Sequence, residues 1–158
     1  MKKWILPFLI FIVLASIGTF IKIYITAMAP IKSAEQNAIS FAEKKAYIKK
    51  VTNYQLYHGL ETVDVVEGTN KRGEKIIVWI PEKSKKVIVK RANSGLSKAE
   101  AIQKVVSLKH PEKIVAVRLG MEKNTPLWEI YYLSNHNLIN YYYISFESGE
   151  WLRNIENL

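Results

Sequence analysis

The side chains that could act as acids, bases or metal ligands are few in this sequence and lie far apart. The three histidines, His58, His110 and His136, follow no metal-ligand spacing, and Asp64 is the only aspartate. The sequence has no cysteine, which excludes thiol nucleophiles, thiolate metal sites and disulfides. Nucleophile-elbow, zinc-protease and phosphate-binding glycine motifs do not occur either. The residues therefore predict no catalytic, cofactor-binding or metal site, and they favour a protein that is not an enzyme.

Glutamates leave one enzymatic alternative open, because spacing alone does not exclude a pair of carboxylates that acts as in glycosidases. Most glutamates fall on predicted helix faces or in turns, where exposure to solvent is the simpler interpretation. An envelope enzyme thus remains a separate hypothesis. Alanine substitution of His58, Asp64 and Glu129 would test it.

A tyrosine-rich stretch at 141–146 alternates as a β-strand does. Alternation places Tyr142 and Phe146 on one face and Tyr141 and Tyr143 on the other. If a helix covers the first face, the second face is open, and Tyr131 of a neighbouring strand lies beside it. Tyrosine gives a large contact area at low entropy cost, so Tyr131, Tyr141 and Tyr143 are the candidate partner-binding surface. The alternative, that this face packs against the preceding part of the chain, stays open.

Residues 4–21 contain no charged side chain. These eighteen residues make roughly 27 Å of helix, close to the hydrocarbon thickness of a bilayer. Apolar character resumes after Lys22, which predicts a membrane-spanning helix over about residues 4–26, with Trp4 and Tyr24 near the two interfaces. The alternative is a cleaved secretory signal with a basic start and an A-x-A site at 27–29. The apolar run is longer than a usual signal segment, which favours a retained anchor over residues 1–29.

Basic residues outnumber acidic ones, 23 to 14. From Pro30 onward the balance is 20 to 14, a net charge of +6. Such a charge suits lipid headgroups or a polyanionic cell wall. Because both interpretations of the N-terminal segment carry the rest of the chain across a membrane, nucleic acid is not an expected partner. We expect a single-pass protein of the cell membrane, with its N-terminus cytoplasmic and its later domains extracytoplasmic.

Two units of similar order follow the anchor, at 30–92 and 93–158. In the first, Ser33 and Gln36 form a capping-box signature, and a helix is predicted over 34–50, before a series of short strands. In the second, Ser97 and Glu100 repeat the signature before a helix that ends near residue 109. The fold class is therefore α+β, with each unit a helix packed on a short antiparallel sheet. Three tryptophans of these units are predicted to lie in the core: Trp79, Trp128 and Trp151.

Three runs of sequence carry a family resemblance: GEKIIVWIPEKSKKVIVKRA at 73–92, GLSKAEAIQKV at 95–105, and PLWEIYYL followed by NYYYISFESGEWL within 126–152. Together with the two-unit layout behind one membrane segment, they resemble the TseB-like cell-wall elongation regulators of Gram-positive bacteria, or YpmB-type family. The resemblance covers essentially the whole chain. It implies tandem cystatin-like, PepSY-related domains, and it brings no catalytic motif.

The same resemblance implies a non-enzymatic accessory protein at the outer face of the membrane. There it would bind a penicillin-binding transpeptidase and so act on peptidoglycan synthesis during cell elongation. The family carries no catalytic residue, cofactor or small-molecule substrate onto this sequence. Two other functions stay open, namely a PepSY-type inhibitor or chaperone of a secreted protease, and the binding of anionic wall polymers through the positive charge.

Overall fold

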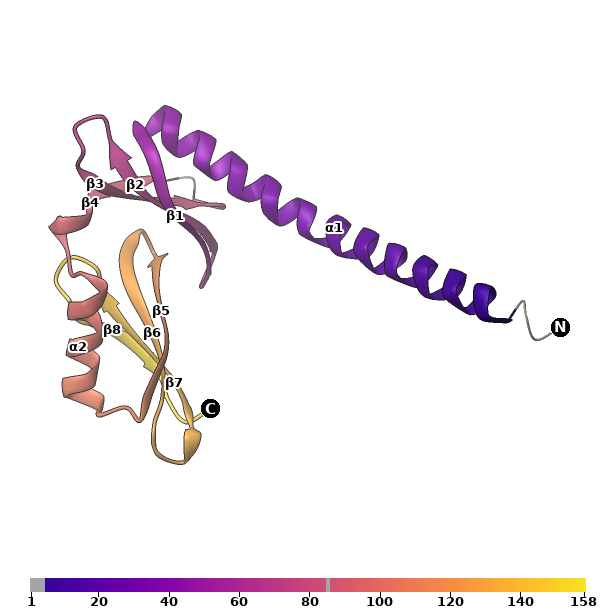
Figure 1. Cartoon of the computed structure of the whole chain (residues 1–158). Helices are drawn as coiled ribbons and strands as arrows, with labels where there is room; N and C mark the ends of the chain where they lie inside the picture. The colour runs from indigo at the N-terminus through magenta and orange to yellow at the C-terminus, as the bar shows by residue number, and fades with distance from the viewer. Residues whose placement is uncertain (1–4, 85) are drawn as a thin grey trace. The chain divides into compact units, whose positions relative to one another are not determined.

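The computed structural model describes residues 5–84 and 86–158 (Figure 1). The predictions for Trp4 and for the basic start of the chain lie outside these residues. The described residues form these elements in chain order: α1 (Ile5–Lys45), β1 (Ile48–His58), β2 (Thr62–Asn70), β3 (Lys75–Pro81), β4 (Ile88–Arg91), η2 (Ala92–Ser94), α2 (Lys98–Lys109), β5 (Lys113–Glu122), β6 (Thr125–Leu133), η3 (Asn135–Asn137), β7 (Ile139–Ser145) and β8 (Trp151–Ile155). An apolar helix followed by two antiparallel sheets, each contacted by a helix, confirms the predicted α+β class.

Helix α1 continues for 41 residues and includes Pro30. The separate helix start predicted at Ser33 is therefore wrong, because this serine is an interior helical residue. Proline removes the hydrogen bond that its own N–H would donate and crowds the carbonyl four residues before it. The alanine-rich residues on both sides favour helix, so the chain tolerates that loss and stays helical.

The N-terminal part of α1 is long and apolar enough to cross a membrane. Two hydroxyl side chains of this part bond within the helix: Ser16 Oγ donates to the carbonyl of Ile12 at 2.8 Å, and Thr19 Oγ1 donates to that of Ala15 at 2.9 Å. These bonds give the hydroxyls partners that a hydrocarbon environment cannot supply. The contact pattern divides the chain into two compact units, Met1–Asn37 and Ala38–Leu158.

The first sheet has the order β1-β2-β3-β4, with all neighbours antiparallel. The end of α1 packs on one face of this sheet, where its alanines let the helix backbone approach the strands closely. The packed residues are Ala38, Ala42, Ala46, Ile48, Val66, Ile76 and Val78. The predicted helix end near residue 50 is wrong, because Tyr47 turns the chain with a φ of 58° and β1 already begins at Ile48.

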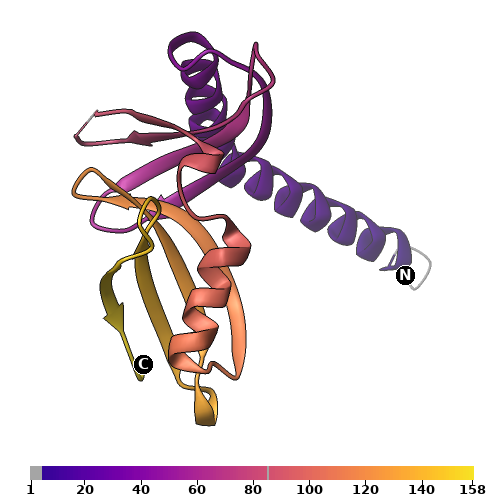
Figure 2. The same cartoon turned by 90° about the vertical axis from the view of Figure 1, so that its left-hand side faces the viewer.

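The second sheet has the order β5-β6-β7-β8 and is also antiparallel (Figure 2). Helix α2 lies on one face of it and buries Ala101 and Val105. The capping box predicted for this helix is confirmed. The Ser97 side chain accepts a hydrogen bond from the backbone N–H of Glu100, and the Glu100 side chain accepts one from the backbone N–H of Ser97. The helix ends at Lys109, as the sequence predicts, and His110 after it adopts a left-handed backbone conformation.

The two sheets share one hydrophobic core within the compact unit Ala38–Leu158. Trp79 of β3 is fully buried and lies edge-on to Phe146, with ring centroids 5.3 Å apart. Trp128 of β6 is 6% exposed, and its ring centroid lies 6.5 Å from that of Phe146. The core prediction is confirmed for these two tryptophans and wrong for Trp151, which is 58% exposed. Trp151 begins the edge strand β8, where a register shift interrupts the pairing and leaves its ring uncovered.

Asp64 lies on β2 and is half-buried, whereas alternation predicts that it points away from the core. Its Oδ1 accepts a hydrogen bond from the Tyr54 hydroxyl at 2.7 Å. Burial raises the pKa of this carboxyl, the Tyr54 bond lowers it by less, and the nearby Glu82 raises it further. Folding thus favours the protonated form of Asp64.

Replacement of Asp64 by asparagine is expected to change the pH dependence of stability. The raised pKa means that the folded wild type holds this proton more tightly, so its free energy of unfolding falls as pH rises above about 4. The Asp64→Asn variant lacks this loss and still accepts from Tyr54. Urea unfolding at pH 4 and pH 7 should show that the free energy of unfolding of the variant, relative to that of the wild type, increases as pH rises. A relative decrease toward pH 7 would contradict the prediction.

Candidate partner-binding surface

Helix α2 covers only one face of the second sheet. Strand alternation directs Tyr142, Ile144 and Phe146 toward the core under α2, as the sequence predicts. The opposite face carries the predicted surface residues Tyr131, Tyr141 and Tyr143. Figure 2 shows α2 on a single side of β5, β6 and β7. The fold therefore supplies the two-sided sheet that the tyrosine prediction requires.

Tyr131 and Tyr141 form the exposed part of this face. They are direct partners in the β6–β7 register, and their rings stack with centroids 5.0 Å apart and planes inclined by 17°. Both side chains are half-buried, so each ring presents part of its surface to solvent. A stacked pair on two hydrogen-bonded strands loses little further entropy when a partner covers it.

Tyr143 differs from its two neighbours because it is only 4% exposed. It lies in β7 between β6 and β8, and the guanidinium of Arg153 covers its ring at 3.8 Å from the centroid. Burial raises the pKa of the Tyr143 hydroxyl, and the neighbouring Glu129 carboxylate raises it further. The expectation that Tyr143 is exposed is therefore wrong, because Arg153 covers its ring.

Glu129 is the cross-strand partner of Tyr143, and its burial on this face is a feature that the sequence interpretation missed. It is 6% exposed, and it pairs with Arg118 of β5 at 3.0 Å. The general expectation of solvent-exposed glutamates is wrong here. Alternation along β6 places Glu129 on the same face as Tyr131, but its burial follows from the pairing of β6 with β5. The Arg118 side chain remains 47% exposed, so the pair presents a guanidinium at the surface.

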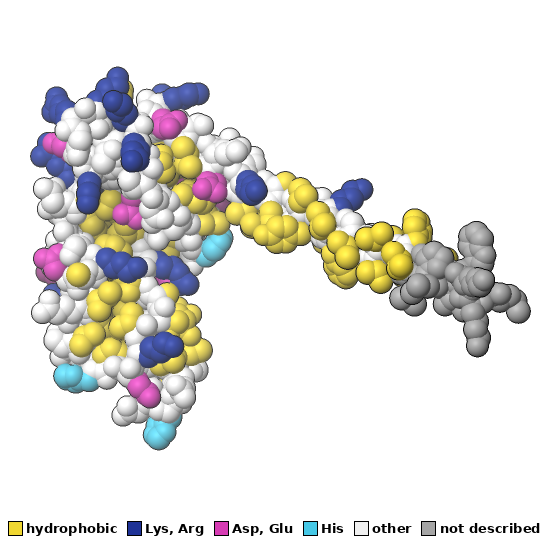
Figure 3. All heavy atoms as spheres, viewed as in Figure 1, with side chains coloured by type: hydrophobic (Ala, Val, Ile, Leu, Met, Phe, Trp, Pro, Cys, Tyr) yellow, Lys and Arg dark blue, Asp and Glu magenta, His cyan; other side chains and the backbone are white. Residues whose placement is uncertain are grey.

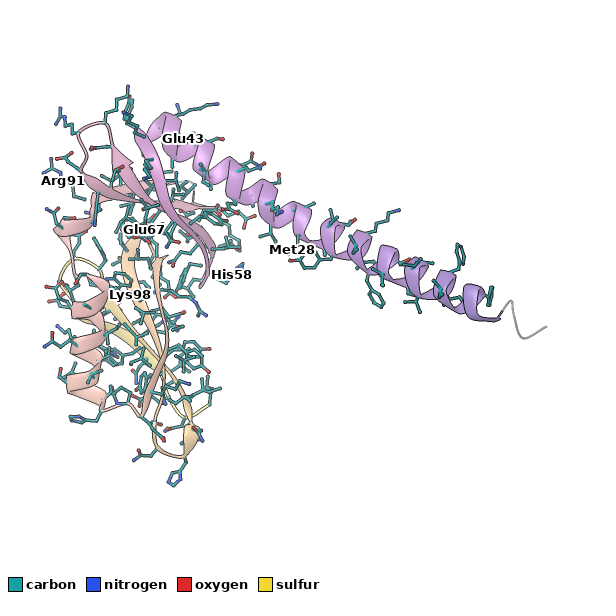
Figure 4. The ribbon with its side chains drawn as sticks, viewed as in Figure 1. Met28, Glu43, His58, Glu67, Arg91 and Lys98 are labelled. Atoms are coloured by element: carbon teal, nitrogen blue, oxygen red, sulfur yellow. The ribbon has the colours of Figure 1, made fainter. Side chains whose placement is uncertain are left out.

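A cavity of about 470 Å³ opens on this face beside the tyrosine stack. Its lining comes from both sheets: Leu56, Tyr57, His58, Arg118, Glu129, Tyr141, Tyr143 and Ile155. Figure 4 shows His58 at the end of β1, which brings it to the same cavity as Glu129. Asp64 is not in the lining. The three residues of the enzyme hypothesis are therefore not assembled in one place, and within residues 5–84 and 86–158 no acidic or histidine cluster could hold a metal ion.

Tyr57 of β1 covers the remaining part of the face. Its ring lies against Gly120 of β5, where any side chain would overlap it, and its hydroxyl donates to Glu122 at 2.9 Å. Glu122 also accepts two bonds from Arg153, at 2.7 and 3.1 Å. The sequence left two possibilities for this face, an open surface and packing against the preceding part of the chain. Each holds in part, because one end of the face packs against the first sheet and the Tyr131–Tyr141 end stays open.

These features define a class: an α+β protein with an apolar N-terminal helix and a partly exposed pair of stacked tyrosines on its second sheet. Comparison with known proteins makes the class specific. The cell wall elongation regulator TseB-like domain matches residues 37–81. The "Probable cell wall elongation regulator TseB" of Bacillus subtilis (strain 168) is 32% identical over 134 residues, covering 84% of this chain and 83% of the relative. The chain therefore belongs to the TseB-like cell wall elongation regulators.

A solved structure of similar fold supports the assignment to this family. The YpmB protein from Bacillus subtilis superimposes with a TM-score of 0.71 at 32% sequence identity. The match covers 77% of this chain and 95% of that chain. The family resemblance carried by the sequence runs is thereby confirmed.

Proposed function

We propose that this protein is a membrane-anchored, non-enzymatic regulator of cell-wall elongation that binds a penicillin-binding transpeptidase. In this proposal residues 1–29 are retained as the anchor, and the units at 30–92 and 93–158 lie on the extracytoplasmic side. The relative in Bacillus subtilis is named as a probable cell wall elongation regulator, which supports the regulatory role.

The observation that carries the proposal is the stacked pair Tyr131 and Tyr141 at the rim of the cavity. The pair combines two partly exposed aromatic rings with the guanidinium of Arg118, the residue types enriched at the centres of protein interfaces. The rings are rigid, because each belongs to a paired strand. A partner can therefore bury them without first ordering them.

The anchor contributes to affinity without making a contact. Helix α1 is long and apolar enough to confine the protein to a membrane. Confinement of this protein and a membrane-bound synthase to the same membrane raises their effective concentration toward each other. A small binding surface is then sufficient. A small binding face such as the Tyr131–Tyr141 pair fits this arrangement.

Joint replacement of Tyr131 and Tyr141 by alanine is expected to reduce partner binding about ten-fold or more, because two central aromatic contacts are lost. The full-length protein is crosslinked in cells, purified, and its bound proteins are identified by mass spectrometry. Recovery of a penicillin-binding protein should fall in this variant while its thermal stability stays close to that of the wild type. Tyr143 is left unchanged, because its buried ring makes a loss of folding hard to separate from a loss of binding.

Trp151→Ala is the matched control, since it removes an exposed aromatic ring from a different strand of the compact unit. The control should recover the partner at the wild-type level. A well-folded Tyr131→Ala, Tyr141→Ala variant that still recovers the transpeptidase would remove this surface from the proposal. Recovery of a secreted protease in its place would favour the inhibitor hypothesis.

A further inference from the structure

Positive charge is concentrated in the first of the two sheets. Residues 38–92 contain 12 basic and 6 acidic residues, whereas residues 93–158 contain 7 of each. The excess charge of the compact unit therefore comes from the end of α1 and strands β1 to β4. A charge confined to one part of a molecule attracts polyanions to that part.

Seven of these basic residues come together at one end of the first sheet. Pairing of Ile48 with Asn70 places the start of β1 beside the β2–β3 turn, and Lys50 and Lys75 lie on either side of Thr69. The last turn of α1 leads into the same end. Figure 3 shows Lys and Arg side chains gathered there. We call this region the basic end, with the members Lys44, Lys45, Lys49, Lys50, Lys71, Arg72 and Lys75.

Few acidic side chains neutralise the basic end. Segments 43–50 and 71–75 contain only Glu43 and Glu74, and Glu74 already accepts from Asn70 and pairs with Arg91 at 3.1 Å. Farther along β2, Glu67 accepts a hydrogen bond from Asn53. All seven basic members are exposed, and the ion pairs among the described residues involve none of them. Their charges are therefore free to meet an anionic ligand.

Tyr47 lies among these lysines and is 70% exposed. It follows the last turn of α1 at the position where glycine or asparagine commonly ends a helix. Its φ of 58° lies in the left-handed region, which is strained for a tyrosine. Since the ring is mostly in solvent, core packing does not explain the residue. An exposed ring between cations offers a flat apolar surface to the carbon skeleton of an anionic polymer.

We propose that the basic end binds an anionic polymer of the cell envelope whose repeating unit is a polyol or sugar phosphodiester. The lysines contact successive phosphates, and Tyr47 packs against the carbon atoms between them. Cations from three separate chain segments suit an extended polymer better than one small anion. A lipid surface fits less well, because Tyr47 is the one exposed large apolar residue among the described residues of the basic end. The choice of a wall polymer rests on the extracytoplasmic placement proposed above.

The test uses the full chain in detergent micelles, with soluble poly(glycerol phosphate) as the probe and calorimetric titration as the measurement. The test variant carries Lys44→Gln, Lys45→Gln, Lys71→Gln and Arg72→Gln. Each exposed charge contributes modestly, so the four changes together should weaken binding roughly ten-fold. Wild-type affinity should also fall steeply as salt rises from about 50 to about 300 mM, because exposed charges are screened.

A matched control removes the same charge elsewhere, through Lys83→Gln, Lys86→Gln, Lys98→Gln and Lys113→Gln. All four of these lysines are exposed and lie outside the basic end. The control should keep its affinity within about two-fold, as expected for a local site. A further variant, Tyr47→Gly, relieves the left-handed strain. It should be as stable as the wild type or more stable, yet bind the polymer several-fold more weakly.

Three results would overturn the proposal. The first is an equal loss of affinity in the test and control variants. The second is full binding by Tyr47→Gly together with equal binding of poly-glutamate, which would reduce the effect to non-specific charge. The third is binding to phosphatidylglycerol vesicles without binding to the polymer. None of these results affects recovery of the transpeptidase, so failure here is distinguishable from failure of the Tyr131–Tyr141 surface.

Discussion

Replacement of Phe146 by alanine is expected to lower the free energy of unfolding by about 3–5 kcal/mol, a large share of the stability of a domain this size. Phe146 is fully buried and packs against Trp79 of the first sheet and Trp128 of the second. Removal of the ring leaves a cavity at the contact between the two sheets, where two large indoles cannot easily move into the space. Thermal unfolding of the full chain in detergent should show a melting temperature lower by about 10 °C or more.

Trp151→Ala is the control for this prediction. It removes a larger aromatic ring from the same C-terminal stretch, but the ring is 58% exposed. The expected change in stability is within about 0.5 kcal/mol. If Trp151→Ala lowers the free energy of unfolding as much as Phe146→Ala does, the burial of the two rings does not explain their contributions to stability.

Replacement of Glu122 by alanine is the second change with a large expected effect. The Glu122 side chain is 11% exposed and accepts hydrogen bonds from Tyr57 of the first sheet and Arg153 of the second. Without the carboxylate, the buried Tyr57 hydroxyl loses its acceptor and Arg153 loses its ion pair. Because Arg153 keeps partial access to water, we expect a loss of about 2–3 kcal/mol. Urea unfolding at pH 7 measures it.

An exposed ion pair between β4 of the first sheet and the turn after β7 of the second supplies the control. Glu147 pairs with Lys90 at 2.6 Å, but its side chain is 49% exposed. Glu147→Ala should therefore cost less than about 1 kcal/mol. If both variants lose the same stability, the buried hydrogen-bond cluster around Glu122 does not hold the sheets together more strongly than the exposed pair.

Much of the fold could be predicted because its signals are local. The capping box fixes the start of α2 through hydrogen bonds between Ser97 and Glu100, which are only three residues apart. Alternation along 141–146 assigns Tyr142 and Phe146 to the covered face, since side chains in a strand alternate whatever lies beyond them. Boundaries were harder where two local preferences compete. Pro30 and Ser33 indicate a break in α1, yet the surrounding helix formers prevail.

The candidate surface was predictable only in part. Strand alternation placed Tyr131, Tyr141 and Tyr143 on one face. It did not decide whether that face is exposed or packs against the preceding part of the chain. Burial of Tyr143 depends on Arg153, ten residues away in the chain and adjacent only through the β7–β8 register. Burial of Glu129 depends likewise on the pairing of β6 with Arg118 of β5. Neither dependence leaves a local sequence signal.

The sequence by itself determined the apolar helix, the α+β order and the tyrosine face, because each depends on composition or on short-range periodicity. It indicated the family through the resemblance of three sequence runs to known members. Only the tertiary structure decided how the two sheets meet. Tyr57 of β1 reaches over Gly120 and bonds to Glu122, a contact between residues 65 positions apart. That contact closes one end of the face and leaves the Tyr131–Tyr141 pair open at the other. The physical reason is that exposure of a face depends on the elements packed against it, which local periodicity does not record.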